Sequence, residues 1–206
     1  MVARWKVHRF RFAVEGEANI YIVDPHEGVP RKLEIDIRGN NLRTWSHDGK
    51  WIYFENGEDS QQATVWKVPT TGGHAIQLVG QEAIQPIESP DGKYVYFVRH
   101  LSLWRVQPDG GAAEPVSGMP QLSGGGDAWF PTGSGVYYLS LNSKTKKAEI
   151  KFFDPKSRTT RVIYVMEKDP PWAYVGGLPV SSDVKWLLFP QVDDQSSDLM
   201  LIENWR

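Results

Sequence analysis

The sequence predicts an all-β protein, a β-propeller of about five four-stranded antiparallel blades whose first and last blades are incomplete. Three observations support this prediction. A nine-residue stretch occurs twice, as SHDGKWIYF at 46–54 and as SPDGKYVYF at 89–97. A second motif follows each copy, TVWKVPTTGG at 64–73 and SLWRVQPDGG at 102–111. No helical periodicity is present, and short-strand units that recur about every 40 residues are typical of propeller blades.

The nine-residue stretch reads as a hairpin turn followed by a strand. Glycine accepts a positive φ and aspartate tolerates it, so Asp48-Gly49 and Asp91-Gly92 predict tight turns. The aromatic and β-branched residues that follow each pair predict strands. The same hairpin recurs in altered form as FPTGSGVYYL at 130–139 and VSSDVKWLLF at 180–189.

The second motif also has weaker copies, NIYIVDPHEG at 19–28, EIKFFDPKSR at 149–158 and DLMLIEN at 198–204. Two of its positions are apolar in every copy, and we expect both to lie in the core. The inner position is occupied by Ile20, Val65, Leu103, Ile150 and Leu199, and the partner position by Val23, Val68, Val106, Phe153 and Ile202.

These copies predict one propeller domain over residues 1–206, with blades at approximately 8–36, 41–79, 84–117, 127–164 and 177–206. The first blade lacks a clear first strand, and the last blade stops after its third. The segment ARWKV at 3–7 could supply the outer strand beside 199–203 and close the ring. The alternative is an open ring, or a ring completed by a partner, with self-association through open blade edges.

Composition limits the function classes. Hydrophobic residues at 40% and charged residues at 23% describe an ordinary globular chain. The net charge of -2 gives no electrostatic reason to expect direct nucleic-acid binding. The absence of cysteine excludes disulfides and cysteine metal sites. No stretch resembles a signal peptide or a membrane span. We therefore expect a cytoplasmic chain, or an extracytoplasmic one if it is a module of a longer membrane-anchored regulator.

A search for catalytic motifs finds none. The sequence contains no G-x-S-x-G elbow, no H-E-x-x-H and no phosphate loop that opens a helix. We therefore expect no enzyme activity, no cofactor and no metal. The loop DDQSSD at 193–198 could hold calcium through its carboxylates, but a solvated hairpin loop is the favoured interpretation. Trp66 and Trp104 are expected to pack between blades rather than to form a sugar platform.

A ligand site, if there is one, is expected at one mouth of the central channel. First strands line the channel of a propeller, and the loops that enter them gather on one face. These loops are 38–43, 81–86, 123–129 and 168–177. Their candidate ligand-binding side chains are Arg43, Gln85, Asp127 and Trp172. The alternative is that these side chains only pack and solvate the channel mouth.

The blade motif SPDGKYVYF with LWRV and GG resembles the TolB-type, WD-repeat-like propeller blade. The ending, from KFFDPKSRTTRVIYV to LMLIENWR, resembles the C-terminal propellers of bacterial winged-helix regulators or serine/threonine kinases. This resemblance implies a non-catalytic sensory or interaction module with a protein or peptide partner. The sequence departs from that family in having neither winged helix nor kinase motif, and fewer than the usual six or seven blades. The alternatives are the non-catalytic propeller of a prolyl-peptidase-like hydrolase and a truncated propeller remnant.

Overall fold

The computed structural model describes residues 8–14, 17–23, 28–37, 41–57, 59–122, 128–168, 178–181 and 183–189, without the side chains of 8–19 and 41–43. The described residues form strands β1 to β15 and contain no helix. The predicted all-β fold is confirmed. Within these ranges no helix is long and apolar enough to cross a membrane.

The strands form four antiparallel sheets, which we call blades one to four, and neighbours within each sheet are consecutive in the sequence. Blade one has three strands, β1 (His8–Val14), β2 (Glu17–Val23) and β3 (Pro30–Lys32). Blade two has four strands, β4 (Asn41–Trp45), β5 (Trp51–Asn56), β6 (Thr64–Pro69) and β7 (Ile76–Val79).

Blades three and four repeat the pattern of blade two. Blade three contains β8 (Ile84–Glu88), β9 (Val95–Arg99), β10 (Ser102–Val106) and β11 (Glu114–Pro115). Blade four contains β12 (Trp129–Pro131), β13 (Val136–Leu141), β14 (Ala148–Asp154) and β15 (Thr159–Val165). After blade four, Val180 and Leu187 form an isolated antiparallel bridge.

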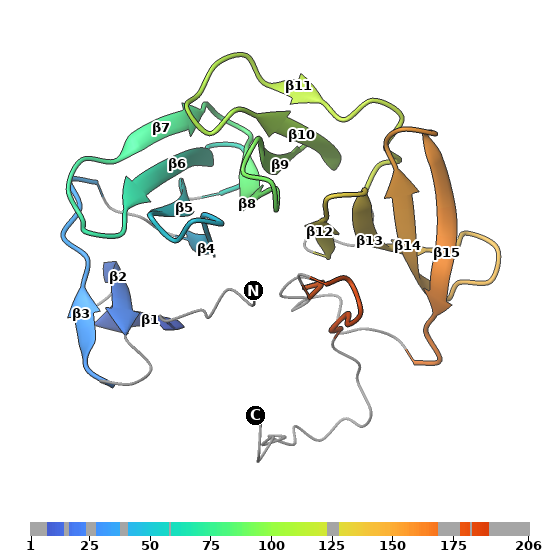
Figure 1. Ribbon diagram of the computed structural model, residues 1–206, viewed down its shortest axis with the longest axis horizontal. Coiled ribbons are helices and arrows are strands. Elements are labelled where there is room, and N and C mark those ends of the chain that lie inside the picture. The colour runs from blue at the N-terminus through green and yellow to red at the C-terminus, as the bar shows by residue number, and fades with distance from the viewer. Residues whose placement is uncertain are drawn as a thin grey trace.

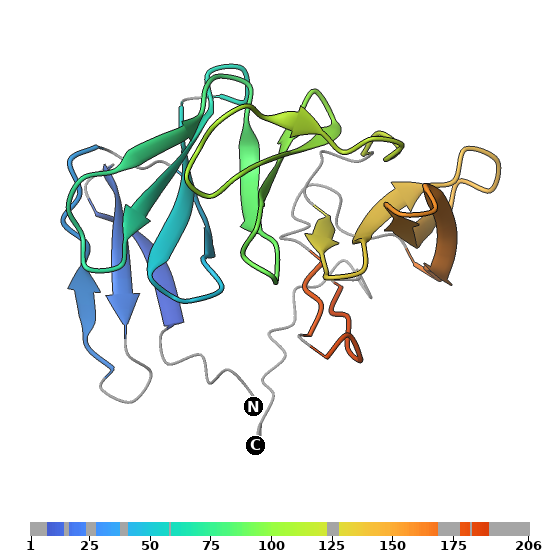
Figure 2. The ribbon, with the colours of Figure 1, turned by 45° about the horizontal axis from the view of Figure 1, so that its top comes forward.

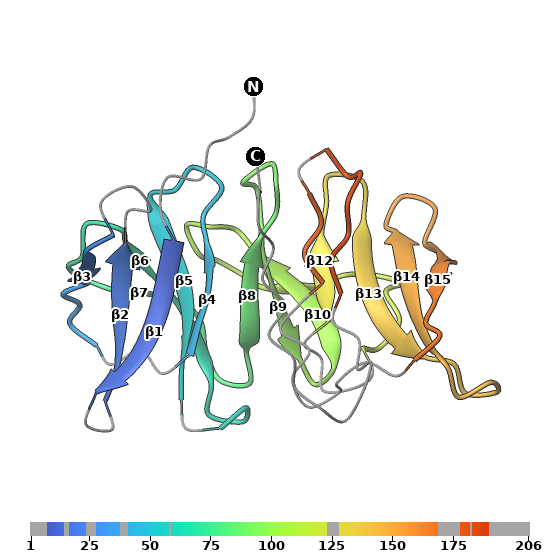
Figure 3. The ribbon, with the colours of Figure 1, turned by 90° about the horizontal axis from the view of Figure 1, so that it is seen from below.

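The blades follow one another along an arc (Figure 1). The first strands β4, β8 and β12 lie on the inner side of the arc, and the last strands β7, β11 and β15 lie on its outer side. Blade one and blade four stand at opposite ends of the arc (Figure 2). In the view from below, the strands stand upright next to one another, so each strand runs roughly parallel to the line of sight of Figure 1 (Figure 3). This arrangement is that of a propeller whose inner strands line a channel.

The core lies between consecutive blades. One cluster joins Ile20 and Leu33 of blade one to Ile52 and Phe54 of blade two, and similar clusters lie at the next two junctions and beside segment 178–189. The predicted inward positions are confirmed where the structure describes them. Each is less than 9% exposed: Ile20, Val23, Val65, Val68, Leu103, Val106, Ile150 and Phe153. Leu199, Ile202 and the proposed closing segment 3–7 lie outside the described residues.

Trp66 and Trp104 lie between blades, as predicted, but neither is fully buried. Trp66 packs against the cluster between blades one and two, and Trp104 packs against the cluster between blades two and three. Both side chains are half-buried. The fully buried aromatic residues of these two blades are Tyr53, Phe54 and Phe97.

The recurring hairpin is held by one hydrogen-bond pattern. The Ser89 hydroxyl donates to Asp91 Oδ1 over 2.7 Å and accepts the Tyr94 amide over 3.1 Å. Ser46 and Asp48 form the same turn in blade two, and Ser181 and Asp183 form it after blade four. The hydroxyl hydrogen bond is the largest of the effects that lower the pKa of all three aspartates.

Candidate functional site

The structure describes the side chain of one of the four predicted site residues, Gln85 on β8. Arg43 lies at a register irregularity in β4, between Leu42 and Thr44, and only its backbone is described. Asp127 and Trp172 lie outside the described residues. The candidate site is therefore built around Gln85, on the inner side of the arc.

Strand β8 is irregular at Gln85. Its pairing with β9 shifts register between Ile84 and Ile87, and Pro86 has no amide hydrogen to contribute to the ladder. Gln85 has a φ of 59°, a value in the left-handed region that costs a non-glycine residue free energy. Irregularities of this kind re-aim side chains and are frequent beside functional sites. Here the irregularity frees the backbone of β8 to bond to another blade.

Two hydrogen bonds join β8 to blade two. The Gln85 amide donates to Glu55 Oε1, and the Thr44 hydroxyl donates to the Pro86 carbonyl over 2.7 Å. Glu55, on β5, is only 3% exposed. A buried carboxylate needs donors, and the displaced Gln85 amide supplies one. The irregular stretch of β8 thus links the inner side of blade three to blade two.

The Gln85 side chain links β8 to blade four. Trp129, on β12, donates its indole Nε1–H to Gln85 Oε1 over 2.9 Å. Both side chains are buried, at 1% exposed for Trp129 and 5% for Gln85. This hydrogen bond fixes the carboxamide, because reversing the amide would place its donor against the indole donor. Gln85 Nε2, the other end of the amide, is buried and has no hydrogen-bond partner among the residues that the structure describes.

An unpaired buried donor is unusual. Leaving one unsatisfied costs about 1–3 kcal/mol, and most buried polar groups in proteins are paired. Gln85 therefore combines two unfavourable features where three blades meet, a positive φ and an amide donor unpaired within the described ranges. Costs of this kind cluster at ligand sites.

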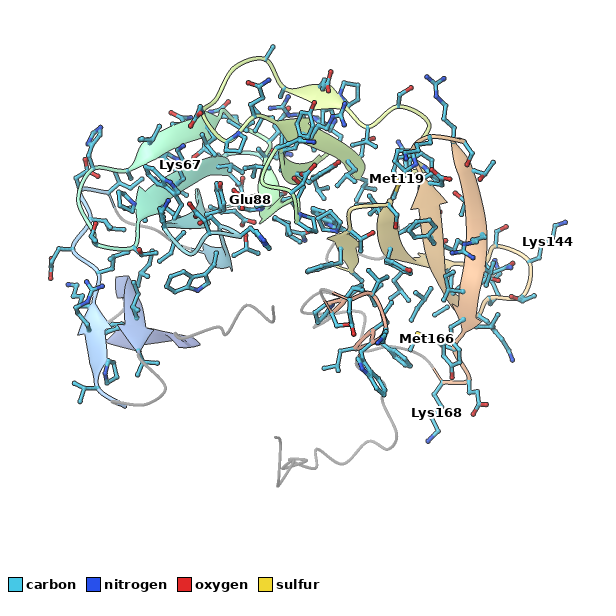
Figure 4. All side chains as sticks on the ribbon, viewed as in Figure 1. Lys67, Glu88, Met119, Lys144, Met166 and Lys168 are labelled. Atoms are coloured by element: carbon cyan, nitrogen blue, oxygen red, sulfur yellow. The ribbon has the colours of Figure 1, made fainter. Side chains whose placement is uncertain are left out.

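Glu88, at the other end of β8, makes a second link between blades. It accepts a hydrogen bond from the Tyr53 hydroxyl over 2.6 Å and another from the His47 amide. Burial, followed by the Glu88 interaction, raises the pKa of Tyr53, so this phenol remains a donor at physiological pH. Figure 4 labels Glu88, which lies among the side chains of blades two and three.

Lys67, also labelled in Figure 4, is a buried cation on β6. Its Nζ donates to the Pro108 carbonyl over 2.6 Å and to Asp109 Oδ1 over 3.3 Å. The same nitrogen lies 4.3 Å from the centre of the Trp51 ring. Lys67 therefore fastens blade two to the turn after β10, and this role accounts for its burial.

The described residues include no group of three or more histidine, aspartate or glutamate side chains arranged to hold a metal ion. His74 pairs with Asp36, and His100 pairs with Glu82 over 2.8 Å, at exposed positions. The loop at 193–198 lies outside these residues.

Sequence reasoning selected Gln85 but missed its two buried partners. Trp129 ends the predicted channel loop 123–129, so its position in the sequence could have signalled it. Glu55 occupies the position that Val98 occupies in blade three. A carboxylate at a core position of the repeat indicates a buried polar contact, so this residue could also have been found from the sequence.

Sequence comparison with known proteins identifies a distant relative of this chain. No family model matches the sequence. The chain is 28% identical over 138 residues to an uncharacterized protein of Agrobacterium fabrum, Atu1656, an alignment that covers 62% of this chain and 45% of the relative. The chain thus spans less than half the length of this curated relative.

Solved structures identify the fold. The structure of putative TolB from Agrobacterium tumefaciens matches with a TM-score of 0.61 and 22% identity, over 78% of this chain and 62% of that one. The fold is that of a TolB-like β-propeller. TolB from Acinetobacter baumannii matches with a TM-score of 0.62 and 15% identity, over 79% of this chain and 41% of that one.

The TolB-like fold is shared with proteins of other kinds. An oligogalacturonate lyase in complex with manganese matches with a TM-score of 0.58 and 17% identity, over 87% of this chain and 54% of that one. At these identities the similarity establishes the fold of this TolB-like chain alone.

Proposed function

We propose that this TolB-like propeller is a non-catalytic scaffold that binds a protein or peptide at its channel mouth and acts as the interaction module of a bacterial regulator. The observation that carries the proposal is the Gln85 carboxamide. One end is fixed by Trp129 over 2.9 Å, and the other is a donor that finds no partner in the described part of the chain.

The chemistry of this group favours an uncharged acceptor. A fixed amide N–H shielded from water makes a stronger hydrogen bond than an exposed one. The buried carboxylate of Glu55 contacts the backbone of the same residue and disfavours a second anion nearby. A peptide carbonyl is a neutral acceptor of this kind. Trp129 is only 1% exposed, so its part is to orient the carboxamide.

The role in a regulator is supported by the ending of the chain, which resembles the propellers of bacterial regulators. The polar contacts between blades support the non-catalytic part of the proposal. Tyr53, Glu88 and Lys67 each bond to a neighbouring blade, so their function is accounted for by assembly of the scaffold.

The test of binding is selection of peptides from a random display library on the immobilised full chain. Selected peptides are then titrated by calorimetry against the wild type, Gln85→Met and Gln77→Met. Methionine keeps the length of the side chain and removes both the Nε2 donor and the Oε1 acceptor of Trp129. Gln77 is an exposed glutamine on β7 that serves as the control. We expect at least a tenfold loss of affinity with Gln85→Met and none with Gln77→Met. Equal affinity for all three proteins, or no selected peptide, would contradict the proposal.

The test of the non-catalytic role is a turnover assay on the purified chain with peptidase, esterase and phosphatase substrates. We expect rates equal to those of buffer. Hydrolysis that a single serine or aspartate substitution abolishes would overturn this part of the proposal and leave the peptide-binding result unaffected.

A further inference from the structure

Leu188 is an exposed apolar residue at a position of the repeat that is covered in other blades. It lies in a β-hairpin after blade four, formed by residues 178–181 and 183–189, which we call the end hairpin. The shared turn hydrogen bonds align Leu188 with Tyr53 of blade two and Tyr96 of blade three. Tyr53 is fully buried, and Tyr96 packs against the cluster between blades three and four. Leu188, in contrast, is 71% exposed.

The exposed surface around Leu188 is one whole face of the end hairpin. Leu187 and Phe189 pack against the cluster that blade four contributes to. Because side chains alternate along a strand, Trp186 and Leu188 lie on the opposite face. Trp186 is 74% exposed. Figure 1 draws the end hairpin in red beside blade four, and the described residues place no strand on its outer face.

The junctions within the molecule show what covers a face of this kind. Between blades two and three, Val95 and Phe97 of β9 lie in one cluster with Tyr53. Between blades three and four, Val136 and Tyr138 of β13 take the same part. The cover is therefore the second strand of an incoming hairpin, which presents an aliphatic residue and, two positions later, an aromatic one.

Every hairpin of this type among the described residues already covers another blade. The hairpin β4–β5 packs on blade one, β8–β9 on blade two and β12–β13 on blade three, while the end hairpin itself packs on blade four. None of these hairpins is left to cover the face that carries Leu188.

Blade one is a poor cover for this face. No described strand precedes β1 in its sheet, so it lacks the first strand that the covering hairpins have. The register places His8 opposite Val23, the position that Val95 occupies opposite Val106 in blade three. A histidine thus stands where the covering strands carry an aliphatic residue. This difference argues against ring closure by blade one and equally against docking of blade one from a second copy.

We propose that the Trp186–Leu188 face of the end hairpin is a docking surface for a β-hairpin of a different protein. The partner hairpin carries an aliphatic residue and an aromatic residue two positions apart on one strand, and it covers Leu188 as β9 covers Tyr53. This surface lies on another part of the arc from Gln85, so it does not depend on the peptide site. One hairpin buries less area than a standard interface, so we expect a dissociation constant on the order of micromolar.

The first experiment tests the chemistry of the partner with displayed libraries of disulfide-closed β-hairpins, selected on the immobilised full chain. The chain has no cysteine that could exchange with the closing disulfide. One library fixes a valine and a phenylalanine two positions apart on the second strand, and its control fixes two serines there. We expect binders from the first library alone.

These binders are titrated against three variants of the chain. We expect at least a tenfold loss of affinity with Leu188→Lys and no loss with Gln85→Met or with Val29→Lys, an equally drastic change at a residue that is 73% exposed. Both changes to lysine are at exposed positions, and circular dichroism checks that the fold is kept. A first library without binders, or binders that hold Leu188→Lys as tightly as the wild type, would overturn the proposal.

The second experiment identifies the occupant through Trp186. The chain is labelled with 5-fluorotryptophan, the ¹⁹F signal of Trp186 is assigned with Trp186→Phe, and its exposure is read from the shift between H₂O and D₂O. We expect a solvent-exposed signal at every protein concentration and a shielded one when a selected hairpin is bound. Shielding in the free chain at low concentration would show that the chain covers its own face. Shielding that appears only at high concentration would show that a second copy does, and either result would contradict a foreign partner.

Discussion

At the residue scale, the serine–aspartate turn shows how a short motif repeats a geometry. Ser89 donates to Asp91, and the hydroxyl then accepts the Tyr94 amide across the turn. The glycine after the aspartate takes a positive φ, 69° at Gly92 and 73° at Gly49. The copy after blade four has Val184 in this place with a φ of 57°. The hydrogen bonds therefore preserve the turn even where the favoured residue is absent.

A reciprocal exchange tests this interpretation. A β-branched residue at positive φ costs about 1–2 kcal/mol. We expect Val184→Gly to raise the free energy of unfolding by about that amount and Gly92→Val to lower it similarly. A side chain at Gly92 would meet no atom within 4 Å, so the loss would come from the backbone alone. Denaturant titration of both variants measures the effect, and a Val184→Gly variant less stable than the wild type would refute it.

The same turn predicts a pH dependence. The Ser89 hydroxyl, which is the largest effect, and the Lys93 amide lower the pKa of Asp91 below its usual range. The ionised aspartate therefore stabilises the fold above about pH 4, the ordinary value for the unfolded chain, and this contribution is lost as the pH falls through the lowered pKa. We expect Ser89→Ala to raise the Asp91 pKa, measured by carboxyl NMR titration, and to cost about 1 kcal/mol. An unchanged Asp91 pKa would show that the hydroxyl does not control it.

At the scale of elements, each blade buries one face against the next, and the burial of the aromatic residues sets the cost of losing them. Phe97 is fully buried, whereas Trp104, which pairs with it on the neighbouring strand, is half-buried. The sequence predicts that both residues pack between blades. The sequence does not show which of the two side chains is more deeply buried, because burial depends on how far each neighbouring sheet extends.

This difference in depth makes a prediction about stability. We expect Phe97→Ala to cost about 3–5 kcal/mol, the range for emptying a buried aromatic site, and Trp104→Ala to cost clearly less. Thermal and denaturant unfolding measure both, with Tyr94→Ala as a control on a half-buried surface ring. A larger loss at Trp104 than at Phe97 would contradict the described packing of blades two and three.

At the scale of the whole molecule, the repeat predicted the all-β propeller and the inward positions of its strands. Both follow from local turn chemistry and the period-2 alternation of strands, which the sequence displays directly. The candidate site was predicted less completely. Gln85 was found because its loop leads into an inner strand, but its hydrogen bonds depend on an irregularity in β8 and on residues of two other blades. Such long-range contacts leave no periodic signal in the sequence.

The most direct test of the binding account is NMR spectroscopy of the ¹⁵N-labelled chain during titration with a selected peptide. Two signals report on the site, the side-chain amide of Gln85 and the indole N–H of Trp129, which donates to it. We expect both to shift on binding, the Gln85 amide most strongly because its free N–H gains an acceptor, while the Gln77 amide stays in place. Saturating peptide that leaves the Gln85 and Trp129 signals unmoved would contradict the account.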